Sequence, residues 1–406
     1  MTIVTDPVGL SVEYPVLAAD LGSGPCPPSA LVNAISALGA PAIRIGGDSE
    51  DQTAPAGVPQ FSGVTDLPSM FWGQLACLDS QTHDPIVVGL NLASQIPAWA
   101  ATMAVQARGA IPATLLSFEI GNEADIDGPS VAWWNATAPA KTLIPFSTYL
   151  NDAQAVKQQI EPGAFVEGPD FATPRWMSVL PRIATSLSLQ TIDTHFYPLN
   201  ACTGSKQATV SALLTPGVSQ VSGFVNETLA AATALHLPMV ISESNSVACR
   251  GKAGVSDSAA AAVWGLRLVI NVVRAGIRSV RFHSSGSSYD PFLVNADGTV
   301  TLRPLYYGLE TAVQLLPVGA TVQSLRTPSD LMGVAVTGLG ATTTYIVTSY
   351  ASRPVTVQLR SRHTATLLSV EAAVPVVEPA KKVKARAGLL TVTIAPNTVV
   401  AITPAS

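Results

Sequence analysis

Short apolar runs alternate with longer amphipathic stretches from residue 8 to about residue 316. The short runs have the length of buried strands, whereas the longer stretches repeat their apolar positions every three or four residues, as helices do. The predicted strands cover residues 8–14, 42–47, 85–91, 115–123, 164–170, 189–197, 238–243 and 279–283. The predicted helices cover residues 29–38, 70–79, 94–108, 147–160, 174–186, a stretch ending near His236, 257–275 and 303–316.

This order of eight strand–helix units predicts an α/β protein whose parallel sheet closes into a (β/α)8 TIM barrel. The alternative is an open doubly wound sheet, which typically carries a glycine-rich phosphate-binding turn after its first strand. The sequence GSGP at residues 22–25 does not have that pattern. Because active sites of barrels lie at the carboxyl ends of the strands, polar residues directly after the strands are the candidates for function.

The pattern changes after Pro317, where valine and threonine alternate in short runs separated by Gly, Pro and Asn. Examples are TYIVT at 344–348, VTVQL at 355–359 and LTVTI at 390–394. A period of two is typical of strands that bury one face, and it predicts a C-terminal antiparallel β-sandwich. We therefore expect a barrel over residues 8–316 and a supporting sandwich domain over 317–406, to which residues 1–7 are a candidate addition.

Composition limits the partners. The 406 residues include 48% hydrophobic and only 12% charged residues, with a net charge of -5. Nucleic acid and anionic membrane are not expected partners, because phosphate binding requires clustered Lys and Arg. The most apolar stretch, 259–277, contains Arg267, Asn271 and Arg274, which would be costly in lipid and suit a helix covering a sheet.

The cysteines at positions 26, 77, 202 and 249 lie far apart, which excludes zinc-finger spacing. Cys202 and Cys249 each follow a predicted strand by a few residues. The sequence favours neither a disulfide between them nor two unpaired thiols over the other. A bridge would indicate secretion, whereas the start of the sequence lacks the pattern of a signal peptide. We expect a secreted or extracytoplasmic protein whose signal has been removed, with a cytoplasmic location as the alternative.

Two glutamates follow barrel strands in similar contexts. LLSFEIGNEAD at 115–125 delivers Asn122 and Glu123 to a loop, and MVISESNS at 239–246 delivers Glu243. Glycosidic cleavage needs an acid that protonates the departing oxygen and, in retaining enzymes, a carboxylate that attacks the anomeric carbon. Either glutamate alone is more often a surface acid, but both together favour a glycosidase. A carboxyl separation of about 5–5.5 Å would indicate retention, and about 6.5–9.5 Å inversion.

Six motifs occur in order along the barrel: RIGG at 44–47, EIGNE at 119–123, HFY at 195–197, SESNS at 242–246, GVSD at 254–257 leading to Trp264, and RFH at 281–283. Together they resemble glycoside hydrolase family 79, the heparanase-like β-glucuronidases of clan A. The resemblance implies a retaining mechanism with Glu123 as acid/base and Glu243 as nucleophile. It also implies that Asn122 binds the sugar 2-hydroxyl and that Tyr197 hydrogen-bonds the nucleophile.

Other residues have less defined roles. His195 and His283 lie at strand ends without a third nearby metal ligand, so we expect sugar-contacting or supporting roles and no metal. Tyr289 and the backbone from Gly251 to Gly254 are candidates for holding a uronate carboxylate, because peptide N–H groups in glycine-rich loops bind anions.

Two charged residues before the strand ends have structural interpretations. Arg44 is interpreted as a brace of the second strand rather than as a partner that orients a carboxylate. Glu119 is interpreted as a buried acid of the barrel interior rather than as a catalyst.

These features predict a retaining exo-β-glucuronidase that removes terminal β-linked glucuronic acid, or its 4-O-methyl derivative, from glycans or glycosides. An endo-acting heparanase-like hydrolase and a β-glucosidase-type enzyme on the same scaffold are alternatives. Outside this class, a carbohydrate-binding protein and a metal-dependent hydrolase remain to be tested. We expect no cofactor, a carbohydrate as the partner, and a monomer.

Overall fold

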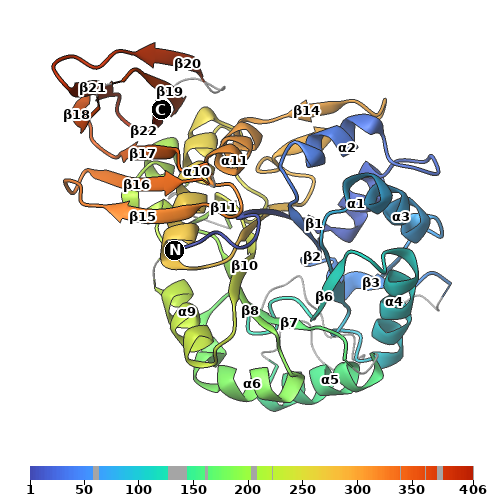
Figure 1. Cartoon of the computed structure of the whole chain (residues 1–406). Helices are drawn as coiled ribbons and strands as arrows, with labels where there is room; N and C mark the ends of the chain where they lie inside the picture. The colour runs from blue at the N-terminus through green and yellow to red at the C-terminus, as the bar shows by residue number, and fades with distance from the viewer. Residues whose placement is uncertain are drawn as a thin grey trace.

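Eight parallel strands form a ring at the centre of the larger domain (Figure 1). The computed structural model describes residues 1–57, 64–126, 144–160, 163–202, 208–221, 223–338, 340–361, 363–372 and 378–405. In sheet order the strands are β6 (Leu115–Ile120), β5 (Ile86–Leu90), β2 (Ala42–Gly46), β1 (Val8–Glu13), β12 (Val280–Ser284), β10 (Met239–Ser244), β8 (Thr191–Phe196) and β7 (Glu167–Phe171). The ends of this order meet through a parallel bridge between Phe118 and Val166. The predicted TIM barrel is therefore confirmed.

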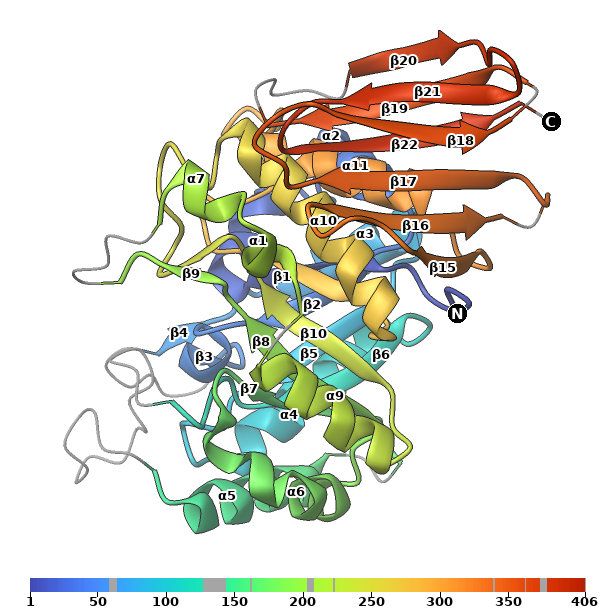
Figure 2. The ribbon, with the colours of Figure 1, turned by 90° about the vertical axis from the view of Figure 1, so that its left-hand side faces the viewer.

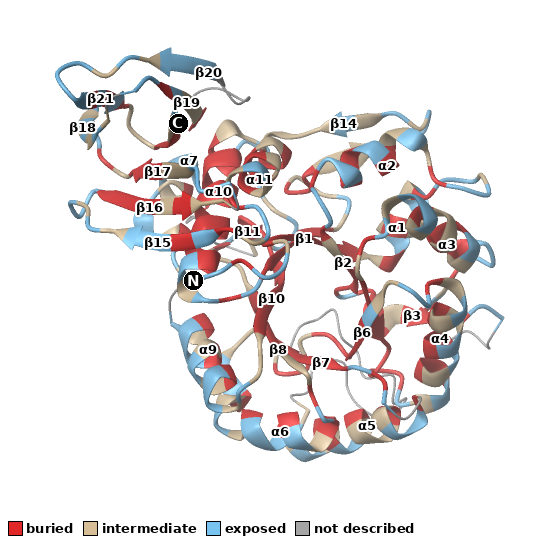
Figure 3. Cartoon of the chain, in the orientation of Figure 1, coloured by how far each residue is buried: buried red, intermediate tan, exposed pale blue. Residues whose placement is uncertain are grey.

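Helices follow the strands and form the outer layer. The main ones are α2 (Ser29–Ser36), α3 (Phe71–Thr82), α4 (Pro97–Ala110), α5 (Phe146–Gln159), α6 (Leu180–Leu187), α9 (Phe224–Ala234), α10 (Ala259–Ala275) and α11 (Pro304–Leu315). Their inward faces are buried against the barrel, while the outward faces of α4, α5, α6 and α9 are largely exposed (Figure 3). This one-sided burial is the reason for the three-to-four-residue apolar period of the sequence.

Several short elements within the barrel domain were not predicted. They are α1 (Tyr14–Asp20), η1 (Glu50–Gln52), β3 (Thr53–Ala54), β4 (Thr65–Asp66), β9 (Leu199–Asn200), α7 (Val210–Leu213), α8 (Pro216–Ser219), β11 (Val247–Ala248), β13 (Phe292–Val294) and β14 (Val300–Leu302). The predicted helix over 174–186 consists of η2 (Pro174–Val179) followed by α6. The first strand was predicted to include Tyr14, but Tyr14 begins α1 instead. Pro15 explains the change, because its fixed φ suits the first turn of a helix.

The C-terminal strands form two antiparallel layers. The larger sheet has the order β15 (Thr321–Leu325), β16 (Leu331–Thr337), β17 (Thr343–Ser349), β22 (Thr398–Pro404), β19 (Ala365–Glu371) and β20 (Glu378–Val383). The smaller sheet pairs β18 (Val355–Arg360) with β21 (Leu389–Ile394). A separate apolar core that includes Val347, Val392 and Ile402 joins the layers. This domain is the predicted antiparallel sandwich.

The start of the chain lies along the edge of the sandwich. Thr2 forms an antiparallel bridge with Thr321, and the Ile3 N–H donates to the Ala320 carbonyl at 2.9 Å. The first residues thus extend the larger sheet beyond β15.

The helix α10 lies between the two domains (Figure 2). Every residue from Ala260 to Val273 is buried, because the barrel covers one side and the larger sheet covers the other. Arg267 inside this helix donates to the Ser349 carbonyl at 2.6 Å and to the Leu214 carbonyl at 3.0 Å. This double burial accounts for the most apolar stretch of the sequence. None of the helices among the described residues is both long and apolar enough to cross a membrane.

Two disulfides lie in the barrel domain; one joins two loops, and the other joins the loop after α1 to helix α3. Cys202 bonds Cys249, which is one of the two outcomes that the sequence left open, and Cys26 bonds Cys77, a pair that was not predicted. The first bridge fastens the loop after β8 to the loop after β10, where β9 and β11 also pair. It therefore holds together the segments that follow Tyr197 and Glu243.

Candidate active site

The two glutamates singled out in the sequence lie at the same end of the barrel. Glu243 is the next-to-last residue of β10, at an irregular step in its pairing with β8. Glu123 follows β6 on a turn in which Gly121 and Glu123 have φ angles of 77° and 46°. Its N–H donates to the Asp170 carbonyl on β7 at 3.1 Å. A positive φ at a residue other than glycine is uncommon and often marks a functional loop.

The two carboxylates are close together. One oxygen of Glu123, one oxygen of Glu243 and one ring nitrogen of His195 all lie within 4.8 Å of one another. An approach this close between two carboxylate oxygens is compatible with the about 5–5.5 Å between the carboxyl groups of retaining glycosidases. The side chains of Glu123 and Glu243 are 15% and 8% exposed, so both can be reached by a ligand.

Glu243 is surrounded by donors. The Tyr197 hydroxyl donates to Oε1 at 2.7 Å, and Arg44 Nη1 donates to Oε2 at 2.7 Å. Burial alone would raise the pKa of Glu243, but nearby cations, first His283 and then His195, lower it to about 2. Glu243 is therefore an ionised and oriented carboxylate, which is the state that a nucleophile requires.

Glu123 has a different partner. The Nδ1 atom of His195 lies 2.7 Å from Oε1 of Glu123, and Nε2 lies 3.0 Å from Oδ1 of Asp170. Burial lowers the pKa of His195, but the charge of Glu243 and the bonds to Asp170 and Glu123 raise it well above its ordinary value. Because carboxylates bind both ring nitrogens, the geometry favours support of Glu123 over contact with a sugar.

His283 occupies a similar position beside Glu243. Its Nδ1 lies 3.0 Å from Ser11 Oγ and 3.5 Å from Oε2 of Glu243, and its Nε2 lies 3.3 Å from Oε1 of Glu13. Burial lowers the pKa of His283, but Glu243 and Glu13 raise it overall. Here too a supporting role agrees with the geometry.

Asn122 directly precedes Glu123 in the sequence, and Arg44 hydrogen-bonds both Asn122 and Glu243. Its side-chain oxygen accepts from Arg44 Nη2 at 3.0 Å, and its N–H donates to Oδ2 of Asp51 at 3.0 Å. Its Nδ2 lies 3.5 Å from Oδ1 of Asp48, a residue that was not predicted as part of the site.

Asp48 is a further carboxyl group at this end of the barrel. Although Asp48 is exposed as a whole residue, its carboxyl group is largely desolvated by the protein around it. This desolvation and the charges of Glu123 and Glu13 raise its pKa to about 7. The sequence offered a weak signal for Asp48, namely its place directly after the RIGG motif at the end of β2.

The interpretation of Arg44 as a brace alone is wrong. Its guanidinium is fully buried and hydrogen-bonds Glu119, Asn122 and Glu243 together. It therefore orients the candidate nucleophile while it also ties β2 to β6. Glu119 is 0% exposed, in agreement with its prediction as an acid of the barrel interior. Sequence position could not reveal the reach of Arg44, because its partners lie on three other strands or loops.

Tyr289 lies beside the pair of catalytic candidates. Its ring centroid is 6.4 Å from that of Tyr197 and 6.0 Å from that of His283. Gly251 approaches it closely, because a Cβ atom there would be 3.1 Å from Cδ1 of Tyr289. Gly251 also has a φ of 75°, so a larger residue would be strained as well as crowded.

The loop from Gly251 to Gly254 uses several of its N–H groups internally. Gly251 donates to the Val247 carbonyl at 3.1 Å, Lys252 donates to Ser256 Oγ at 3.0 Å, and Gly254 donates to Asp257 Oδ1 at 2.6 Å. These three N–H groups are therefore already engaged, and the loop offers fewer donors to a uronate carboxylate than expected.

The cluster of Glu123, His195 and Glu243 is compact enough to be compared with a metal site. However, both nitrogens of His195 and both oxygens of Glu243 already have partners, and Arg44 adds a positive charge beside Glu243. This donor set suits proton chemistry better than cation binding.

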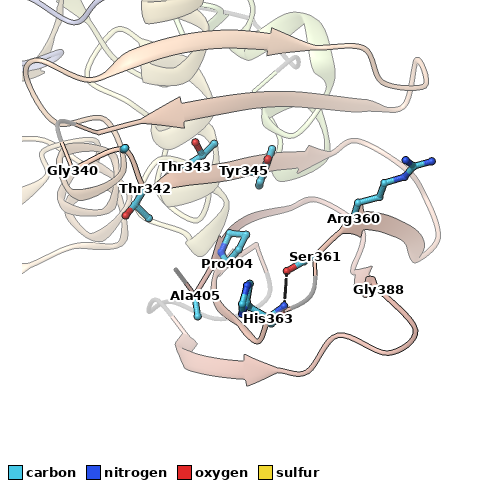
Figure 4. Close-up of a pocket in the computed structure, with 11 residues that line it drawn as sticks. Gly340, Thr342, Thr343, Tyr345, Arg360, Ser361, His363, Gly388, Pro404 and Ala405 are labelled. Carbon is cyan, nitrogen blue, oxygen red and sulfur yellow. Dashed lines mark hydrogen bonds between the residues drawn. The ribbon is translucent and has the colours of Figure 1, made fainter.

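A hollow of about 830 Å³ lies in the sandwich, at one end of the two sheets (Figure 4). Its described lining includes Tyr345, Arg360 and His363 but no Asp or Glu. Without a carboxyl group it lacks the pair of acids that glycosidic cleavage requires. The carboxyl end of the barrel is therefore the candidate active site.

The fold of the whole chain is shared with solved structures of glycoside hydrolases. A 4-O-α-L-rhamnosyl-β-D-glucuronidase from Fusarium oxysporum 12S is similar with a TM-score of 0.73 and 18% identity, over 99% of this chain and 97% of that one. A GH51 arabinofuranosidase from Xanthomonas axonopodis pv. citri is similar with a TM-score of 0.72 and 14% identity, over 100% and 97% of the two chains.

A third similar structure is the catalytic domain of the GH30 xylanase C from Talaromyces cellulolyticus, with a TM-score of 0.60 and 10% identity over 100% of this chain and 98% of that one. The sequence matches no family model and no curated protein. The chain thus has the barrel-plus-sandwich fold of these hydrolases, and its resemblance to family 79 stays a prediction.

Proposed function

We propose that this protein is a retaining glycoside hydrolase. The observation that carries the proposal is the close approach of Glu123 and Glu243, whose nearest oxygens lie within 4.8 Å. Their surroundings differ, since Glu243 is bound by Tyr197 and Arg44 whereas Glu123 is bound by His195. Two carboxyl groups in unlike environments are the arrangement that separates a nucleophile from an acid/base.

In the proposed reaction, Glu243 attacks the anomeric carbon while Glu123 gives a proton to the departing oxygen. Glu123 then takes a proton from the water that releases the sugar from Glu243. Tyr197 and Arg44 hold the attacking carboxylate in place. The side chain of Asn122 is held by Arg44, which presents it to the sugar beside the two acids.

For the substrate we propose a terminal β-linked glucuronic acid. The family 79 motifs and the similarity of fold to the Fusarium rhamnosyl-glucuronidase support this choice. Tyr289, adjacent to Tyr197 and Gly251, is the proposed contact for the uronate. The two disulfides further support action in an oxidising, extracytoplasmic compartment.

A second candidate is a glycosidase for a neutral sugar. The engaged N–H groups of the Gly251 loop and the acidic pair Asp48 and Glu13 favour it, because they disfavour an anionic sugar. The fold similarity to a GH51 arabinofuranosidase belongs with this candidate.

The test compares hydrolysis of p-nitrophenyl β-glucuronide, β-glucoside, β-galactoside and α-L-arabinofuranoside. Turnover of the glucuronide alone, with the β-anomer as the first product in NMR, would support the proposal in full. Turnover of a neutral glycoside instead would change the proposed substrate but keep the proposed glycosidase reaction. Loss of all turnover in Glu243→Ala, beside an unchanged Glu227→Gln on the exposed face of α9, would assign the activity to this site.

No turnover of any glycoside by the parent protein would contradict the exo-acting proposal. Polysaccharide digestion would then separate an endo-acting hydrolase from a carbohydrate-binding protein. Binding of a glycan without cleavage would favour the latter.

A further inference from the structure

Asp170 is connected to the candidate acid/base Glu123 directly through its backbone carbonyl and indirectly through His195. It is the next-to-last residue of β7, is 1% exposed and has a φ of 55°. Its carbonyl accepts the Glu123 N–H at 3.1 Å, and its Oδ1 lies 3.0 Å from Nε2 of His195. Since Nδ1 of His195 lies 2.7 Å from Oε1 of Glu123, the three side chains form a continuous chain.

The carboxylate of Asp170 is fixed and ionised. Ser242 Oγ donates to Oδ1 at 2.7 Å, Arg44 Nη2 lies 3.5 Å away, and the Asp170 N–H donates to Asp193 Oδ1 at 2.7 Å. Burial alone would raise the pKa of Asp170, but Arg44 and His195 lower it below its usual range. An ionised Asp170 accepts the Nε2 proton of His195 and thereby fixes the tautomer.

With Nε2 protonated toward Asp170, the other ring nitrogen and Oε1 of Glu123 face each other across 2.7 Å. A nitrogen and a carboxylate oxygen at this distance share one proton. The position of that proton determines whether Glu123 can act as an acid.

Five charged or titratable groups face His195 from the elements around it. They are Arg44 on β2, Glu123 after β6, Asp170 on β7, Asp193 on β8 and Glu243 on β10. Burial and the charge of Asp170 raise the pKa of Asp193 well above its ordinary value. The ionised groups Asp170 and Glu243 attract a proton to His195, and Arg44 partly offsets them.

The geometry points to Asp170 as a positioning residue that, through His195, retains on the His195–Glu123 pair the proton that Glu123 delivers to the leaving group. This inference rests on the proposed glycosidase function. It assigns to Asp170 and His195 a role in proton supply rather than in sugar binding.

The proton balance follows from the two steps. In the first, the bond from C1 to the leaving oxygen breaks, Glu243 forms a bond to C1, and the shared proton passes through Glu123 to the leaving oxygen. His195 is then neutral, with its remaining proton on Nε2 toward Asp170. In the second step, water forms a bond to C1 as the bond to Glu243 breaks, and one proton of that water returns to the His195–Glu123 pair.

The test measures how the rate of the 406-residue chain carrying Asp170→Asn depends on the leaving group. A 2,4-dinitrophenyl glycoside leaves with little need of a proton, whereas a phenyl glycoside needs one. We expect kcat/KM for the phenyl glycoside to fall about 100-fold, the lower range of general acid catalysis, and kcat/KM for the dinitrophenyl glycoside to fall less than about 3-fold. The alkaline limb of the phenyl profile should move to lower pH, because His195 loses its anionic partner.

A purely structural role for Asp170 predicts equal losses for both leaving groups and an unmoved pH profile, and that result would overturn the inference alone. A parent protein inactive on all glycosides would overturn the proposed function as well. Asp330 lies in an exposed turn of the sandwich domain and provides the matched control. Asp330→Asn makes the same substitution away from the site and should change neither rate.

His195→Gln provides an independent variant if Asp170→Asn unfolds at a lower temperature than the parent. It should show the same selective loss with phenyl glycosides, and the double variant should lose no more than either single one, since both residues act on one proton. An equal loss for both substrates in His195→Gln would overturn the inference.

Discussion

Arg44 Nη1 lies 2.7 Å from Oε2 of Glu243, so a residue of β2 holds a carboxylate of β10 across the barrel. The same guanidinium reaches Glu119 in the interior and Asn122 in the loop after β6. One side chain thus connects the barrel core to the candidate nucleophile. Stability and activity should therefore change together when it is replaced.

Replacement of Arg44 by methionine leaves Glu119 and Glu243 without their buried cation. We expect a loss of about 3–5 kcal/mol in the free energy of unfolding, the usual cost of breaking a buried ion pair from one side, measured by urea denaturation. Activity should fall with it, and Arg44→Lys should recover stability better than kcat because it lacks the planar fork. Equal stability of Arg44→Met and the parent would contradict this account.

Removal of the Tyr197 hydroxyl should change the pH profile. Tyr197 donates to the ionised form of Glu243 and helps to lower its pKa to about 2. In Tyr197→Phe the pKa of Glu243 should rise, so the acidic limb of kcat/KM should move to higher pH. Tyr306→Phe is the control, because that hydroxyl bonds the Ala34 carbonyl at 2.7 Å away from the site and its loss should leave the limb in place.

Asp84 should make stability decrease with rising pH. Burial raises its pKa to about 7, whereas an unfolded Asp titrates near 3.9. Stability from this group is therefore complete below about pH 4 and is lost as the pH rises through about 7.

Asp84→Asn should thus stabilise the protein at pH 8 by about 2 kcal/mol, roughly half of what a shift of three units represents, since solvent screens part of it. At pH 4 the variant should gain almost nothing. Urea unfolding at both pH values measures the difference, with Asp330→Asn as the exposed control. A gain of the same size at pH 4 would reject the electrostatic explanation.

The two disulfides allow a matched comparison. They span similar sequence separations of 47 and 51 residues, so each should contribute about 2–4 kcal/mol by restricting the unfolded chain. Only the Cys202–Cys249 bridge joins the loops that follow Tyr197 and Glu243. We expect paired serine variants to lose similar stability, while only the Cys202/Cys249 variant also raises KM; similar KM values in both would contradict the assignment.

Incubation with EDTA tests the absence of a metal from the proposed reaction. Both carboxylate oxygens of Glu243 and both ring nitrogens of His195 already have protein partners, so chelation should leave kcat/KM unchanged. Loss of activity that zinc or manganese restores would favour the metal-dependent alternative.

The barrel strands could be predicted because each is a short apolar run followed by a polar residue, as in β6 and β10. The period-two pattern of β21, in which exposed and buried residues alternate strictly, made the sandwich equally visible. Tyr14 was misassigned because the apolar run of β1 continues into α1, and only Pro15 marked the change.

The candidate site could be predicted only as far as local context reached. Glu123 and Glu243 stood out from the strands before them, but the partners of His195 depend on which strands become neighbours after the barrel closes. Asp170 and Asp48 were each one polar residue among many at strand ends. The Cys26–Cys77 bridge likewise joins positions that no local pattern connects.

The burial of α10 from Ala260 to Val273 has a consequence for the whole chain. A helix with apolar residues on every side is unstable against water. A chain shortened before β15 would therefore expose an aggregation-prone apolar surface where the sandwich now lies. Its Arg267 would also lose the Ser349 carbonyl to which it donates. The sandwich is therefore the second wall of one continuous interior, and neither domain can be exchanged for an unrelated module without redesign of this helix.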